Sequence, residues 1–109
     1  MAAIVFASDI LRHTCVSNQW QEVTIPDRCR VFTVNNESAT DNALVAYATT
    51  NGDAGAIHAN DEYVTVPPLA TRIFQLGSGG PSRAYAPALM YVGANPANTP
   101  QLALEVQRA

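Results

Sequence analysis

The chain has 109 residues, of which 48% are apolar and 14% are charged, and its formal net charge is −3 at pH 7. This length fits one domain with a single core, and the apolar content excludes a disordered chain. All six basic residues are arginines scattered along the chain, which excludes the basic patch that direct nucleic-acid binding needs.

Residues 1–18 differ from the rest of the chain. Their apolar start, Ile4, Val5 and Phe6, precedes the pair "SD", which favours the beginning of a helical turn. We expect an arm or first strand over residues 1–18 and a β-domain over residues 19–109. No positive region precedes the apolar run, and no run approaches the ~20 apolar residues of a membrane span. Neither a signal peptide nor membrane binding is therefore predicted.

From residue 19 onward, apolar residues recur with a period of two. The clearest case is "QLALEVQRA", in which Leu102, Leu104 and Val106 alternate with less apolar residues. This pattern is typical of a half-buried strand. Clusters of Gly, Pro and Asn separate seven such segments, which cover residues 20–26, 29–36, 43–52, 62–66, 70–76, 86–94 and 101–109.

Two prolines, Pro67 and Pro68, lie between two of these segments. Proline has no backbone N–H and is excluded from central strands, so we expect a stiff corner where the chain crosses from one sheet to the other. Short strands with such punctuation predict an all-β fold. We expect a single antiparallel β-sandwich, jelly-roll or immunoglobulin-like, of about seven or eight strands with an N-terminal arm.

Two segments, residues 70–76 and 86–94, are apolar on both faces. In the first of them, Ile73 takes one face and Phe74 the other. A two-layer sandwich has only one inside, so the second face needs a cover, either the N-terminal arm or a neighbouring subunit. The residues expected at such an interface are Ile4, Val5, Phe6, Ile73, Leu89 and Tyr91.

Residues for catalysis or metal binding are sparse. His13 and His58 are the only histidines, Cys15 and Cys29 are the only cysteines, and their spacing matches no common zinc pattern. A nucleophilic pair of His13 and Cys15 lacks an orienting third group. We therefore predict no enzyme, no metal and no cofactor. Free thiols are expected, with a disulfide as the alternative.

A carbohydrate-binding module is the alternative function. Trp20 and Tyr63 carry aromatic rings that can stack on a sugar, and Asp53 lies in the acidic turn "NGD". A weak calcium site in this turn is a further alternative, because carboxylates suit calcium. The simpler interpretation is a solvated turn, with aromatic residues that close the core.

Three motifs resemble those of a known group of proteins. "VNN" at residues 34–36 leads into a turn, "VPPLATR" forms a corner that opens the next strand, and "YVGA" precedes the last strand. Over residues 20–107 the chain resembles the small β-sandwich virion proteins of tailed bacteriophages, which decorate or cement capsids or form tail modules. The resemblance implies a non-enzymatic structural protein that binds the capsid surface and stabilises the shell through contacts repeated by symmetry.

The same resemblance implies the partners and the location. The partners are the major capsid protein and copies of the chain itself, in a homo-oligomer that is a trimer or larger. The location is the virion, after assembly in the host cytoplasm. For the alternative carbohydrate-binding module, the corresponding role is attachment to a host surface or within a tail.

Overall fold

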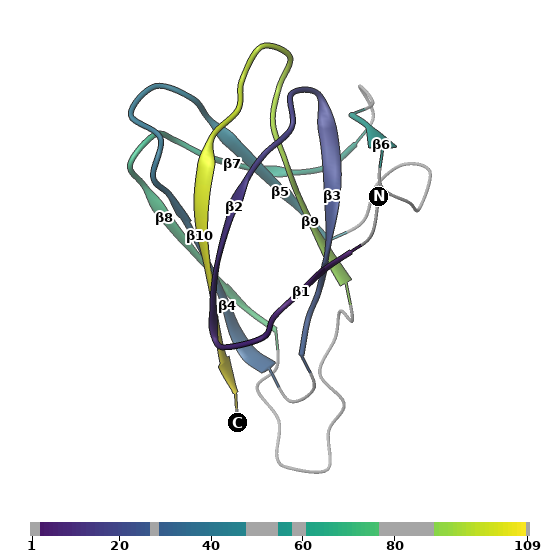
Figure 1. Cartoon of the computed structure of the whole chain (residues 1–109), viewed down its shortest axis with the longest axis vertical. Helices are drawn as coiled ribbons and strands as arrows, with labels where there is room; N and C mark the ends of the chain where they lie inside the picture. The colour runs from purple at the N-terminus through teal and green to yellow at the C-terminus, as the bar shows by residue number, and fades with distance from the viewer. Residues whose placement is uncertain (1–2, 27–28, 48–54, 58–60, 77–88, 109) are drawn as a thin grey trace.

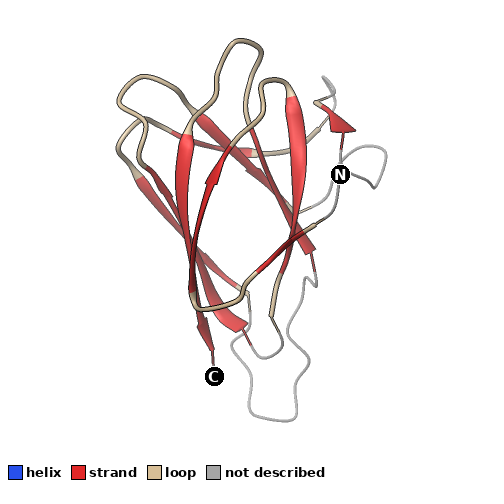
Figure 2. Cartoon of the chain, viewed as in Figure 1, coloured by secondary structure: helices blue, strands red, loops and turns tan. Residues whose placement is uncertain are grey.

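The structure is a computed structural model that describes residues 3–26, 29–47, 55–57, 61–76 and 89–108. Within these residues the chain is all-β and contains no helix (Figure 2). Accordingly, none of the described residues forms a helix that could cross a membrane. Two sheets face one another around a core, so the prediction of an all-β, sandwich-like fold is confirmed (Figure 1).

The first sheet has six described strands in the order β1-β3-β9-β5-β7, with β6 also paired to β3. β1 pairs with β3 in parallel, and the other pairs are antiparallel. β1 contacts the end of β3, whereas β6 contacts its beginning. The strands are β1 (Ile4–Val5), β3 (Gln19–Thr24), β5 (Ala43–Ala46), β6 (Gly55–Ala56), β7 (Val64–Val66) and β9 (Leu89–Gly93).

The second sheet has four described strands, all antiparallel, in the order β2-β10-β4-β8. They are β2 (Ile10–Thr14), β4 (Cys29–Asn36), β8 (Thr71–Gln75) and β10 (Gln101–Arg108). Taken together, the two sheets show nested pairing. β2 pairs with β10, β3 with β9, β4 with β8, and β5 with β7.

The two sheets share one core because each turns an apolar face inward. Leu102 and Leu104 of β10 are fully buried, whereas Glu105, on the opposite face of the strand, is exposed. Met90 and Val92 of β9 belong to the same cluster from the opposite sheet. Burying one such side chain stabilises the fold by about 1.5–3 kcal/mol. The alternation read from the sequence therefore identifies the core face of β10 correctly.

The N-terminal segment joins the two sheets. β1 belongs to the six-stranded sheet and β2 to the four-stranded sheet, so the chain crosses between them over residues 6–9 (Figure 1). Phe6, at this crossing, is buried, and its ring meets that of Phe32 at 88° with centroids 6.5 Å apart. The division of the chain into residues 1–18 and 19–109 stays a prediction.

The expectation of a helical turn after "SD" is wrong, because these residues lead directly into β2. Leu11 is half-buried against the core, and Ile10 and Arg12 face outward. This alternation pairs β2 with β10 along its whole length, and the resulting ladder satisfies the backbone groups that a short helix would leave open.

The predicted strands match those of the structure best where apolar and polar residues alternate without interruption. Residues 29–36 form β4, and residues 101–109 contain β10. β5 and β9 are shorter than residues 43–52 and 86–94, parts of which lie outside the described residues.

The proline corner also behaves as predicted. It connects β7 in the six-stranded sheet to β8 in the four-stranded sheet. Ala70 donates its N–H to the carbonyl of Pro67 at 3.1 Å, which closes a four-residue turn with Leu69 at φ 60°. The crossover between sheets at this corner is therefore confirmed.

The six-stranded sheet has a second buried cluster on its other face. Trp20, Leu44, Ala46 and Tyr91 are buried there, and Ile57 packs against them. Gly93, opposite Trp20 in the register, leaves room for the indole: a Cβ at Gly93 would lie 2.8 Å from Trp20 Cε3. We call residues 55–57 and 61–63 the cover segment. For residues 86–94, this segment takes the covering role that the sequence assigned to the N-terminal arm or a neighbouring subunit. For residues 70–76, none of the described residues supplies the expected cover, because Ile73 is exposed.

Candidate functional site

The candidate functional site is the outward side of the four-stranded sheet, which we call the outer face. It consists of the outward-pointing residues of β2, β10, β4 and β8. The strand register arranges these side chains in rows across the sheet. The middle row is Ile10, Glu105, Thr33 and Ile73, and the next row is Arg12, Ala103, Asn35 and Thr71.

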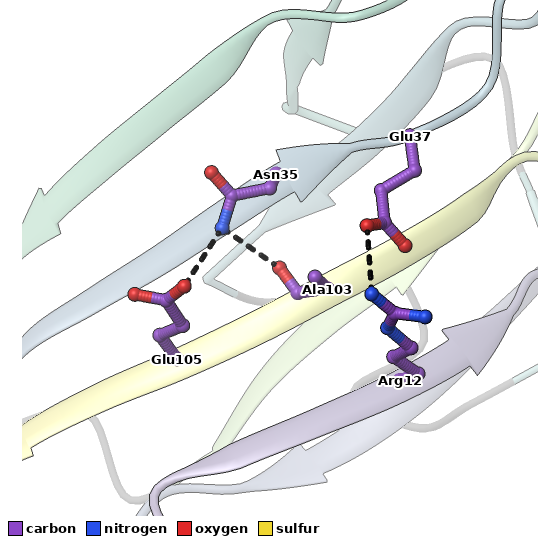
Figure 3. Close-up of polar contacts among 5 residues, drawn as sticks. All are labelled: Arg12, Asn35, Glu37, Ala103 and Glu105. Carbon is purple, nitrogen blue, oxygen red and sulfur yellow. Dashed lines mark hydrogen bonds and ion pairs between the residues drawn. The ribbon is translucent and has the colours of Figure 1, made fainter.

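Asn35 organises the polar centre of the outer face. Its Nδ2 donates to the carbonyl of Ala103 at 3.2 Å and to Glu105 Oε1 at 3.4 Å. Its Oδ1 accepts a hydrogen bond of 2.6 Å from Thr71 Oγ1. Figure 3 shows Asn35 reaching from β4 toward Ala103 and Glu105 of β10. One amide therefore links three neighbouring strands and holds the Glu105 carboxylate in place.

Arg12 and Glu37 form an ion pair beside this centre. Arg12 Nη2 lies 3.3 Å from Glu37 Oε2, and both side chains are partly exposed (Figure 3). An exposed ion pair contributes only ~0–1 kcal/mol to stability. Its effect here is to bring two opposite charges together beside the polar centre. The outer face therefore presents hydrogen-bonding groups that are already oriented.

Two isoleucines flank the polar centre. Ile10 is 62% exposed and Ile73 is 61% exposed, on the two outermost strands of the four-stranded sheet. Three strand spacings separate them, or roughly 14 Å at about 4.8 Å each. Single exposed apolar residues are common and need no explanation. Here, however, two of them occupy opposite ends of one row, with ordered polar groups between them.

The predicted arm residues have divided roles. Ile4 packs against the core and Phe6 is buried within it. Val5 between them is 65% exposed on β1. Ile4 and Phe6 therefore anchor the start of the arm to its own chain, and of these three residues only Val5 offers its side chain to solvent.

The other predicted interface residues also separate. Ile73 lies on the outer face, whereas Tyr91 is 4% exposed beneath the cover segment and offers no free surface. Leu89 pairs with Thr24 through its backbone, and its side chain lies outside the description. Ile10 was missed because "SD" indicated a helical turn. The signal that identifies it is the alternation of "ILRHT".

The residues of the alternative ligand site do not form a stacking platform. Trp20 is 1% exposed, and its Nε1 donates to Asp61 Oδ2 at 2.8 Å. Tyr63 is exposed, and its ring lies 6.1 Å from that of Trp20 at 58°. Asp53 lies outside the described residues. The indole therefore binds the cover segment. Of the two aromatic residues, only Tyr63 is exposed to solvent.

Three titratable residues singled out from the sequence, Cys15, Cys29 and His13, have side chains that turn toward the interior. Cys15 and Cys29 are both buried free thiols. Burial raises the pKa of Cys15 to about 12 and also raises that of Cys29. Burial lowers the pKa of His13, whose buried Nε2 has no hydrogen-bond partner. His58 lies outside the described residues, among which no three His, Cys, Asp or Glu side chains gather to hold a metal ion.

Comparisons with known proteins give no match. None is found among protein-family models, curated proteins or solved structures. The resemblance to phage virion proteins rests on the three sequence motifs and stays a prediction. Any function must therefore be inferred from the surfaces described above.

Proposed function

We propose that the chain is a non-enzymatic structural protein of a virion, a decoration or cement protein that binds the capsid surface and copies of itself. The observation that carries this proposal is the outer face, where Ile10 and Ile73 flank an ordered polar centre. Protein interfaces combine apolar anchors with hydrogen-bonding groups, and unpaired charges are depleted at their core. The outer face has two apolar anchors and hydrogen-bonded polar groups, among which the Glu105 carboxylate is bound by the Asn35 amide.

The ordering of the polar centre supports binding. Ordering a long side chain at an interface costs about 0.5–1.5 kcal/mol, which weakens association. Asn35 and Glu105 are hydrogen-bonded before any partner arrives, and Arg12 is paired with Glu37. Part of the free-energy cost of ordering these side chains is therefore already offset within the chain. A partner would contact groups that need little rearrangement.

We further propose that the fold is a jelly roll. The nested pairing of β2 with β10, β3 with β9, β4 with β8 and β5 with β7 favours this fold over the immunoglobulin-like one. Viral capsid domains, lectins and cupins all use jelly rolls. The fold therefore supports a virion role but does not choose among these three functions.

Individual residues favour the structural role over the other two. Of the two aromatic residues expected to stack on a sugar, Trp20 is buried and bonded to Asp61, which leaves Tyr63 alone exposed. A cupin metal site needs several histidines close together, and the sequence has only two, of which His13 faces the core. Cys15 is protonated at neutral pH because its pKa is about 12, so it is a poor nucleophile.

The proposal implies that a phage encodes the chain, and it is tested on the virions of that phage. We expect mass spectrometry of purified virions to detect the chain in many copies per particle. Recombinant chain added to capsids that lack it should sediment with them. Ile73→Glu should reduce the bound fraction at least tenfold, because it places a charge on the outer face.

Val5→Glu is the matched control. Val5 is as exposed as Ile73 but lies on β1 of the other sheet. The Val5→Glu variant should bind capsids within about twofold of the original chain. Absence of the chain from virions would contradict the virion role, and equal losses in the two variants would contradict the choice of the outer face.

A further inference from the structure

We propose that the partner that fits the outer face is a second copy of this chain, stacked face to face about a two-fold axis parallel to the strands. The inference deepens the proposed function, on which it rests for the use of this face in binding. It names one partner and the residues that meet it.

The middle row is complementary to itself. It runs Ile10, Glu105, Thr33, Ile73 across β2, β10, β4 and β8. A two-fold axis parallel to the strands, midway between β10 and β4, turns the row over and reverses its order. Ile10 of one copy then lies over Ile73 of the other, and the same contact occurs twice. Such reciprocal contacts define an isologous dimer.

The charges on the face permit the same arrangement. In the middle row, Glu105 of one copy faces Thr33 of the other. In the next row, Arg12 faces Thr71 and Ala103 faces Asn35. Neither row places two like charges directly opposite each other, and Arg12 keeps Glu37 as its partner within each copy. The two Glu105 carboxylates become diagonal neighbours across the axis, and each keeps its hydrogen bond to Asn35 of its own copy. Like charges at an interface would cost several kcal/mol and suppress the contact.

The size of the face indicates a weak dimer. Four strands at about 4.8 Å spacing and five residues at about 3.4 Å rise span roughly 300 Å² in the plane of the sheet. Stable interfaces bury ~800 Å² on each partner, so this one belongs with transient contacts. Because the same face is proposed to bind the capsid, the dimer and the capsid-bound chain exclude each other, and a weak dimer dissociates readily when the capsid is present.

The test is the solution mass of the chain across a concentration series, measured by light scattering. We expect the mass to rise from 11.6 kDa toward twice that value as the concentration increases. Ile10→Glu and Ile73→Arg should each hold the mass at the monomer value. Their double variant should restore dimerisation, because each new carboxylate then faces a guanidinium of the other copy.

Two controls make the result specific. Within one chain positions 10 and 73 are separated by two strands, so restoration in the double variant reports a contact between copies. Ile10→Glu combined with Ile73→Glu should stay monomeric, and Val5→Glu should dimerise like the original chain. Circular dichroism confirms that each variant is folded, and Ile73→Thr, which keeps a β-branched side chain, serves as a milder substitution.

Two results would overturn the inference: a monomer at every concentration, or a dimer that the single substitutions do not weaken. Failure of the double variant to recover would overturn the two-fold arrangement. These outcomes are separable from the proposed function. A strict monomer that still binds capsids contradicts only the inference, and a dimer that is absent from virions contradicts only the virion role.

Discussion

Leu69 occupies a backbone conformation that its side chain disfavours. It stands at φ 60° in the third position of the turn closed by Pro67 and Ala70, and it is 72% exposed. That position in a type II turn favours glycine or asparagine. For other residues the left-handed region costs about 1–2 kcal/mol. An exposed leucine recovers little of this cost through packing, so the turn is strained.

Leu69→Gly should therefore stabilise the chain. We expect the free energy of unfolding to rise by about 0.5–1 kcal/mol, after allowance for the greater entropy of glycine in the unfolded state. Urea denaturation measures this change. Leu69→Ala is the control, because it removes the side chain and keeps the strain, and it should stabilise by clearly less. A Leu69→Gly variant less stable than the original would show that the leucine side chain holds the corner.

His13 should make stability depend on pH. Burial lowers its pKa in the folded chain below the ordinary value of 6.5. Between the lowered pKa and 6.5 the unfolded chain binds more protons, so the free energy of unfolding falls as the pH drops. The stability due to neutral His13 is fully present above pH 6.5. His13→Leu should flatten this dependence between pH 7 and 5 in denaturation series, and an unchanged slope would exclude His13 as its source.

Among the elements, the cover segment is joined to β3 by a buried hydrogen bond. Trp20 Nε1 donates to Asp61 Oδ2 at 2.8 Å, with both residues buried. A hydrogen bond to a charged group stabilises by about 1.5–3 kcal/mol. In a double-mutant cycle of Trp20→Phe and Asp61→Ala, we expect a coupling energy in this range from denaturation curves. A coupling below about 0.5 kcal/mol would mean that the indole ring, rather than its N–H, holds the segment.

Strands were predictable where one face is polar and the other apolar. β4 and β10 follow from unbroken alternation, and their registers place Phe32 and Leu104 in the core. β2 was hidden by the preceding "SD", a local signal that the long ladder with β10 overrides. The cover segment was also hidden. Trp20 and Val23 lie on opposite faces of β3. A large apolar side chain on each face was the signal that the second face of the sheet is buried.

At the scale of the whole molecule, the sheet order could not be predicted. Every nested pair joins strands far apart in the chain, as β2 and β10 do, and local patterns carry no record of which distant strand is the neighbour. The proline corner was the exception. The crossover between sheets at Pro67 and Pro68 followed from the chemistry of proline alone.

The candidate site was predictable only in part, because local patterns identify single residues but not their neighbours on other strands. Ile73 was identified because its strand is apolar on both faces. Asn35 was noticed only as a turn former, although its amide links three strands. The meeting of Ile10, Glu105, Thr33 and Ile73 in one row is a property of the register, which appears only when four separate segments are assembled.

The central claim is that the outer face of the four-stranded sheet is the surface that binds. The most direct test is a set of amide chemical shifts in ¹⁵N-labelled chain, followed by NMR as the concentration is raised and then on addition of capsid protein. The account predicts shifts concentrated at Ile10, Thr33, Asn35 and Ile73, with Tyr63 and Leu69 unchanged. Shifts that centre on Tyr63 or Leu69 and spare the outer face would contradict it.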